Sequence, residues 1–363
     1  MLTFKIENGL GVFVPADQDE ADRQEEKLRD LVIAVGSGDT ELEQAANQVR
    51  DMIKADELFL KGYPLLAEMV GGDDDEQAEQ VYLDGYKAAL KIIPADFHGP
   101  LDAENADVQC FLRCHTGYVE SLTVKGRYKE AIEAVRRQLV FDPSDMFERE
   151  RELGEMHVMD GQYDEARRIL EEQAKNRPTA LYSLAYLDFM AENFSRAAAR
   201  LRQAFILAPY TVDFITGRMT SPNLFWQAGP RAPEYQDELM YVEGLGGEIW
   251  TVDNEGLAFI EWLSQTSAAL ADRATMAAIS EKSFLAGEAG TQEADEFMAL
   301  WEKAGDASVA LVKMVKNPET GDLVHPWELL AEYHEKLNEE NGLFEEDDDC
   351  GCGCGCEGHD HKH

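Results

Sequence analysis

An internal repeat between residues 107 and 210 constrains the fold of this chain more than any other feature of the sequence. Three segments share a turn residue, an aromatic residue two positions later, then an alanine, an aliphatic residue and a closing proline. The aligned residues are Gly126, Tyr128, Ala131, Val135 and Pro143, then Gly161, Tyr163, Ala166, Leu170 and Pro178, then Glu192, Phe194, Ala197, Leu201 and Pro209. The prolines lie 35 and 31 residues apart, close to a period of about 34 residues that is typical of stacked helical hairpins.

Each shared residue type has a physical role in such a hairpin. The small alanine lets two helices approach closely, while the aromatic and aliphatic side chains fill the space beside the crossing. Glycine closes the tight turn between the helices, and proline ends the second helix of each pair. In the third segment Glu192 replaces the turn glycine and the spacing is four residues short, which predicts a distorted inter-helix loop or entry in that unit.

These residues, together with the pair Leu153-Gly154, resemble tetratricopeptide repeats over residues 107–210. The resemblance implies an all-α solenoid of helical hairpins with flanking helical segments. The first helices of the pairs would form an inner wall that binds an extended or helical peptide. The lysine and asparagine positions with which one branch of the family clamps a terminal carboxylate are absent here, so that class of partner is not implied.

A narrower resemblance begins where the repeats stop. Residues 208–218, APYTVDFITGR, are similar to the segment that follows the repeats in a family of bacterial tetratricopeptide proteins related to suppressor of tumorigenicity seven. An acidic segment and a tryptophan-containing helix follow there, as residues 234–243 and 256–263 do here. The first asparagine, the second proline and the paired leucines of that family are missing. The family implies a helical interaction protein and names no reaction.

The rest of the chain divides into three regions. Residues 1–100 are predicted as a helical region with a short β-hairpin at 2–14 that turns at Asn8-Gly9. Residues 211–340 are predicted as a C-terminal helical region whose clearest runs are 268–289 and 293–315. Residues 341–363 are predicted as a flexible acidic tail rich in cysteine and histidine.

The charge balance excludes some classes of partner. With 33 Lys and Arg against 72 Asp and Glu, the formal net charge is −39. Such a chain repels nucleic acid and anionic membrane surfaces at long range. It also lacks a basic segment followed by an apolar run at its start, and no window approaches a membrane span. We therefore expect a cytoplasmic protein whose partner is another protein or peptide, and the excess of acid favours a basic one.

The repeat register predicts which side chains line the inner wall. The candidate positions are Arg113, Thr116 and Glu120, then Glu148, Arg151 and Glu155, then Thr179, Tyr182 and Tyr186. Of these, the predicted partner-binding residues are Arg113, Glu120, Arg151, Glu155, Tyr182 and Tyr186. The two tyrosines indicate an aromatic contact site at one end of the groove.

The tail carries the ligand types that bind soft metals. The predicted ligands are Cys350, Cys352, Cys354, Cys356, His359, His361 and His363. Thiolates and imidazoles suit Zn, Ni or Cu, but the alternating spacing differs from the paired cysteines of a structural zinc site. A solvated tail that binds metal only adventitiously is the alternative. No cofactor is required for the scaffold function, and a metal carrier or sensor is the competing function.

The sequence contains no recognisable catalytic motif, so we expect no enzyme. Phosphate-binding loops, nucleophile elbows, dinucleotide fingerprints and zinc-protease helices are all missing. Cys110 and Cys114 lie four apart on a predicted helix and are expected to face the core. A lone histidine such as His157 is expected to be structural.

Overall fold

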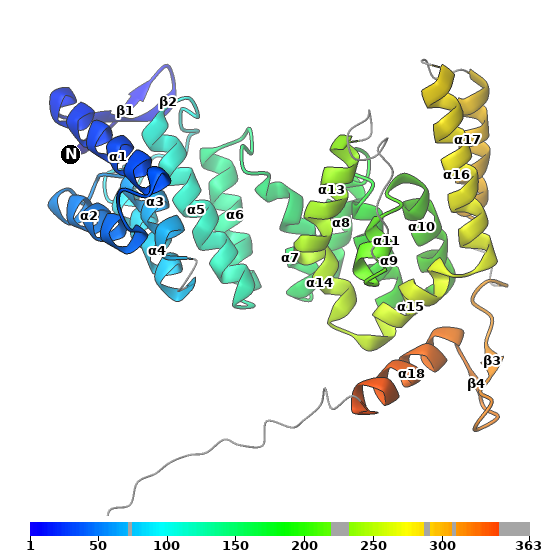
Figure 1. Ribbon diagram of the computed structural model, residues 1–363. Coiled ribbons are helices and arrows are strands. Elements are labelled where there is room, and N and C mark those ends of the chain that lie inside the picture. Colours follow the sequence, from blue (N-terminus) through cyan, green and yellow to red (C-terminus); the bar gives the residue numbers. More distant parts are fainter. Residues whose placement is uncertain (72–74, 219–231, 287–290, 307–309, 341–363) are drawn as a thin grey trace, which may run out of the picture. The chain divides into compact units, whose positions relative to one another are not determined.

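The computed structural model describes residues 1–71, 75–218, 232–286, 291–306 and 310–340 (Figure 1). It is mostly helical, which confirms the predicted class at that level. The described chain forms two compact units. The first contains Met1–Asn193 and the returning segment Ser221–Ile249, and the second contains Phe194–Thr220 and the chain from Trp250 onwards. The boundary between the units thus falls inside the third predicted repeat.

The predicted N-terminal hairpin is confirmed. Strands β1 (Leu2–Glu7) and β2 (Leu10–Pro15) pair in antiparallel fashion with Phe4 opposite Phe13. Asn8 and Gly9 both have positive φ, 52° and 85°, as a two-residue turn of this hand requires. Phe13 is buried and lies edge-on to Phe111, with 6.0 Å between ring centroids. The hairpin is therefore anchored in the core of the first unit.

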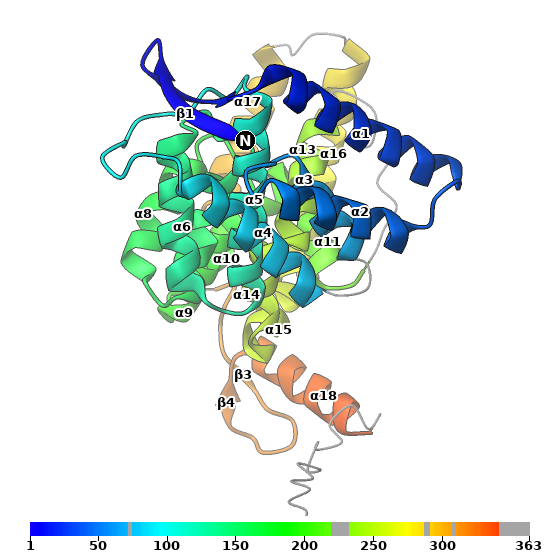
Figure 2. The same cartoon turned by 90° about the vertical axis from the view of Figure 1, so that its left-hand side faces the viewer.

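Four helices follow the hairpin: α1 (Gln18–Ser37), α2 (Leu42–Ala55), α3 (Gly62–Val70) and α4 (Asp75–Leu90). Each packs against the next, and Figure 2 shows α1 and α2 side by side. Asp17 begins α1 by accepting a hydrogen bond from the Glu20 amide, and Gly38 ends it in the left-handed region. Leu31, Val49 and Leu66 belong to the core that holds α1, α2 and α3 together.

The repeat segment of the first unit forms α5 (Ala106–Val124), α6 (Tyr128–Phe141), the 3-10 turn η1 (Arg149–Glu152), α7 (Leu153–Met159), α8 (Tyr163–Gln173) and α9 (Ala180–Met190). Consecutive helices from α4 to α9 pack against one another. Tyr86 of α4 stacks on Phe111, His115 and Tyr118 of α5. The repeat alanines Ala131 and Ala166 are fully buried, as expected for close helix approach.

The three predicted turn positions have the same backbone geometry. Gly126, Gly161 and Glu192 have φ of 67°, 73° and 56°. Each donates its amide to the carbonyl three residues back, and the next residue donates to the carbonyl five residues before it. This pair of bonds is the Schellman ending of a helix. The glutamate at the third turn therefore adopts the conformation that glycine adopts at the other two.

The second unit contains α10 (Phe194–Leu207), α11 (Thr211–Ile215), α15 (Asn254–Ser264), α16 (Ser267–Ala286), α17 (Thr291–Ala304) and α18 (Pro326–Glu340). The expectation of a helix through Val315 is wrong, because α17 ends at Ala304 and Val315 lies in β3 (Val315–Lys316), which pairs with β4 (Leu323–Val324). Trp327 is buried, with its ring 4.8 Å from that of Phe259 and 4.9 Å from that of Phe194.

Between α11 and α15, the described residues form α13 (Ala232–Glu243) and α14 (Leu245–Thr251). The whole of α13 belongs to the first unit, whereas Phe194–Thr220 belongs to the second. The helix that the sequence showed only as an acidic segment thus returns to the predicted repeats.

Candidate protein-interaction site

Two of the six predicted partner-binding residues are exposed on α5. Arg113 forms an ion pair with Glu68 of α3 and keeps about half of its side chain in solvent. Glu120, two turns further along α5, pairs with Arg149 at 3.2 Å and is 57% exposed. Both residues are therefore accessible to a partner, and the ion pairs that hold them are surface pairs of small energy.

The other four predicted residues are buried. Tyr182 and Tyr186 on α9 are 0% and 5% exposed, and Glu155 on α7 is 3% exposed. Arg151 on η1 keeps 8% of its side chain exposed. The expectation that these side chains stand open to solvent does not match this conformation of the chain. A contact with a partner at these four positions stays a prediction.

Helix α13, lime green in Figure 1, covers part of this face. The Arg151 guanidinium donates from Nη2 to the backbone carbonyl of Asp237 at 2.9 Å. The Asp237 carboxylate accepts from Thr179 Oγ1 at 2.7 Å, and Arg177 Nε lies 3.5 Å from it. The surface that η1 and the start of α9 turn toward α13 therefore binds one carboxylate with one hydroxyl and two arginines. We call Arg151, Arg177, Thr179, Ser183 and Glu155 the docking face.

One turn further along α13, Tyr241 makes the second polar contact. Its hydroxyl lies 3.0 Å from Ser183 Oγ, and Ser183 in turn donates to Glu155 Oε1 at 2.7 Å. The Tyr241 ring also lies 5.9 Å from the ring of Tyr182. Because residues four apart share a helix face, Asp237 and Tyr241 point at the same surface. Leu245, four residues on, joins the buried cluster that contains Leu153 and Met156.

Burial changes the acid–base behaviour of two groups on α7, namely Glu155 of the docking face and His157. Loss of solvent raises the pKa of Glu155 above its ordinary value, and the hydrogen bond from Ser183 only partly opposes this. His157 is fully buried, and burial together with the nearby Arg136 lowers its pKa. His157 Nε2 lies 3.2 Å from Arg136 Nη2, within the helical core of the first unit, which agrees with a structural histidine.

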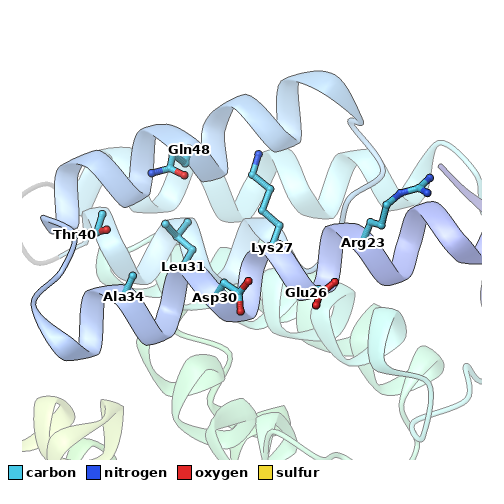
Figure 3. A pocket seen from close by; sticks show the side chains of 8 residues that line it. All are labelled: Arg23, Glu26, Lys27, Asp30, Leu31, Ala34, Thr40 and Gln48. Atoms are coloured by element: carbon cyan, nitrogen blue, oxygen red, sulfur yellow. The ribbon is translucent and has the colours of Figure 1, made fainter.

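Elsewhere on the first unit, an open groove of about 520 Å³ lies between α1 and α2. Figure 3 shows its lining, in which Arg23, Glu26, Lys27 and Asp30 alternate in charge along α1 and Gln48 faces them from α2. A wide groove with mixed charges offers a ligand neither a strong electrostatic potential of one sign nor an enclosed apolar surface. We assign no ligand to this groove.

The two body cysteines face the core, as predicted. Cys114 is fully buried and Cys110 is half-buried in the same cluster. Burial raises the pKa of the Cys110 thiol to about 11, so the thiol stays protonated and unreactive at neutral pH. Within the described ranges, no three His, Cys, Asp or Glu side chains gather as metal ligands. The seven predicted ligands of the tail lie outside the described residues.

Comparison with known proteins leaves the resemblance to tetratricopeptide repeats as a prediction. No protein-family model matches the sequence, and no curated protein matches it either. Among the helices of the described ranges, none is long and apolar enough to cross a membrane.

Sequence reasoning missed four residues of the site: Arg177, Ser183, Asp237 and Tyr241. The first two lie beside the predicted positions but outside the inner-wall register. A weak signal for the other two existed, because Asp237 and Tyr241 of the acidic segment and Leu245 just after it are spaced four residues apart. Nothing in that spacing indicated which surface the segment would meet.

Proposed function

We propose that this protein is a non-catalytic scaffold that binds a helical segment of another protein on the inner face of α5, η1, α7 and α9. The observation that carries the proposal is the docking of α13, since a helix already occupies part of this face through specific side-chain contacts. Helix-in-groove recognition uses anchors on one helix face, as Asp237 and Tyr241 are. The absence of catalytic motifs from the sequence agrees with a binding role.

The accessible part of the face gives the cleanest test. Replacing Tyr182 with alanine would open a cavity in the core, so loss of binding could reflect loss of fold. Arg113 and Glu120 are exposed, and the double variant R113E/E120K reverses both charges without changing the net charge. We expect it to lose the partners that the full-length chain captures, as measured by quantitative affinity capture and mass spectrometry.

A matched control lies on the second helix of the same pair. Lys129 and Glu133 are exposed on α6, and K129E/E133K makes the same two charge changes away from the inner face. This control should capture the same partners as the unchanged protein. If R113E/E120K also captures them all, the inner face is not the binding surface.

A metal-handling function is the second candidate, and the sequence pattern of four cysteines and three histidines favours it. In this proposal the tail carries or senses Zn, Ni or Cu while the helical body binds a partner. Native mass spectrometry of the full chain and of a chain ending at Asp349 separates the two functions. A bound metal that is lost with the tail supports metal handling. If the tail binds no metal under saturating conditions, the metal-handling function is rejected.

A further inference from the structure

We infer that α13 is an internal occupant of the docking face, and that the same face accepts a partner helix that carries a carboxylate and, four residues later, a tyrosine. This inference rests on the proposed scaffold function and adds to it the chemistry of the partner and the way access is regulated. The partner helix replaces α13, so binding and release of α13 are coupled.

The course of the chain allows α13 to leave the docking face while the helices that carry this face stay packed. The chain leaves the first unit after Asn193, returns to it at Ser221, ahead of α13, and leaves again after Ile249. Helices α5 to α9 follow one another in the sequence. Each of them packs on the next one without a contribution from α13. Removal of α13 from its site therefore breaks the docking contacts but none of the hairpin contacts within α5 to α8.

The docking contacts are largely polar. The side chains through which α13 makes hydrogen bonds to the face are Asp237 and Tyr241. Permanent interfaces resemble a hydrophobic core cut in half, whereas exchangeable ones are more polar. A helix that docks through a carboxylate and a phenol therefore resembles an exchangeable ligand more than a core helix.

The residues of the docking face determine which charge a helix that replaces α13 must carry. Without α13, Arg151 and Arg177 lose the main-chain and carboxylate oxygens of Asp237, and Ser183 loses the Tyr241 hydroxyl. A basic helix would place its cations against these arginines. An acidic helix restores the contacts, so the local chemistry favours an acidic, tyrosine-bearing partner although the whole chain carries a charge of −39.

The internal helix lowers the apparent affinity for any external one. Because α13 covers the face, only the fraction of molecules in which it has left can bind, and the apparent dissociation constant rises by the inverse of that fraction. Weakening α13 alone must therefore strengthen the binding of an external copy. This inverse response separates an exchangeable occupant from a fixed structural helix.

The test uses a fluorescent peptide of residues 232–245 as the probe and the full-length chain as the receptor. The unchanged chain should bind it weakly. The chain with D237A and Y241F should bind it at least about tenfold more tightly, as loss of a charged hydrogen bond predicts. A peptide with the same two replacements should bind at least about tenfold more weakly than the unchanged peptide, and adding R177A to the receptor should abolish the gain. Equal affinity of the unchanged and the D237A/Y241F receptors, both folded by circular dichroism, overturns the inference.

A second measurement needs no variant. A peptide of residues 232–245 uniformly labelled with ¹³C and ¹⁵N is added to the unchanged chain at about millimolar concentration, to match the effective concentration of the tethered α13. It should speed amide hydrogen exchange in 232–243 of the chain, while α9, then covered by the peptide, should exchange as slowly as before. The isotope label separates peptide fragments from chain fragments in the mass spectrum. Binding without faster exchange in 232–243 means that α13 stays in place, and the inference fails. In that case loss of capture by R113E/E120K would still support the scaffold function, so the two failures are distinguishable.

Discussion

Glu192 shows how a single residue can keep an unfavourable conformation inside a regular turn. Its φ of 56° lies in the left-handed region, which costs a residue with a Cβ about 1 kcal/mol or more. The hydrogen bonds from Glu192 and Asn193 to the end of α9, 2.8 and 2.9 Å long, hold the residue there. At Gly126 and Gly161 the same turn costs no such strain.

Replacing Glu192 with glycine should therefore stabilise the chain by about 1 kcal/mol, as measured by urea unfolding. The matched control is Gly161→Ala. A Cβ built at Gly161 meets no atom within 4 Å, so only the backbone conformation is affected and a loss of about 1 kcal/mol is expected. If E192G and G161A shift stability in the same direction, backbone strain does not explain the turn.

Glu155 makes the free energy of unfolding depend on pH. Burial raises its folded-state pKa above the ordinary 4.5, so its contribution to stability is complete below pH 4.5 and is lost as the pH rises through the raised value. Glutamine imitates the protonated form and can still accept the Ser183 hydrogen bond. The gain in unfolding free energy from E155Q should thus be near zero at pH 4.5.

Above that pH, the gain from E155Q should grow by up to about 1.4 kcal/mol per pH unit. Urea unfolding of both proteins from pH 4.5 to 8 measures it. The exposed Glu133→Gln on α6 is the control and should show no such growth. A constant difference between E155Q and the unchanged protein would mean that the Glu155 carboxyl does not titrate differently in the folded state.

At the scale of elements, α7 and α8 show how a hairpin of the first unit is closed. A Cβ built on Gly154 of α7 would lie 2.6 Å from Leu170 Cδ2 of α8, too close for the two helices to keep their spacing. Leu170 itself is fully buried. The contact explains why glycine and leucine stand at these two positions of the second repeat.

Gly154→Ala should destabilise the chain by about 1–3 kcal/mol, the usual cost of overpacking a core. The same substitution in a Leu170→Ala background should cost less, because the smaller side chain leaves room for the new methyl group. A double-mutant cycle by chemical unfolding measures this coupling. Additive effects would show that the helices can move apart freely.

The elements that the sequence predicted well are those specified by local spacing. Alanine, aromatic and glycine positions recur within a few residues of one another, and they placed the turns at Gly126 and Gly161 correctly. The end of α17 was harder to predict from the sequence. The apolar positions keep a helical spacing up to Val315, but the helix ends at Ala304 and Val315 lies in a strand.

The docking face could not be predicted because it depends on distant residues. The repeat register placed Tyr182 and Glu155 on the inner wall, but their burial involves Tyr241, 59 residues beyond Tyr182. Local periodicity carries no information about such long-range pairing. The same limit explains why Asp237 was seen only as part of an acidic segment.

At the scale of the whole molecule, the second unit has its own buried ionic centre. Arg202 of α10 donates two hydrogen bonds to Asp272 of α16, at 2.8 and 2.5 Å, and Lys303 of α17 lies 3.0 Å from the same carboxylate. Asp272 is fully buried. Three helices therefore meet at one carboxylate that solvent does not reach.

Asp272→Asn should cost the second unit about 3–5 kcal/mol, because Arg202 would then be buried without its counter-charge. Amide hydrogen exchange should become faster in α10, α16 and α17 and stay unchanged in α5 and α6. The control is Lys282→Gln, which breaks the exposed pair with Glu296 between α16 and α17 and should cost under about 1 kcal/mol. Equal effects of the two variants would exclude a special role of the buried centre.

Because α13 is covalently joined to the rest of the chain, a free partner needs a minimum affinity to replace it. A segment joined to the chain on both sides competes at a fixed effective concentration, which is in the millimolar range for short connections. A free partner at about micromolar concentration would have to bind about a thousandfold more tightly than α13 to replace it. A partner that is also held to the chain by a second contact would not need this higher affinity. We therefore expect a bivalent partner, with one helix for the docking face and another segment for the two exposed residues Arg113 and Glu120 of α5.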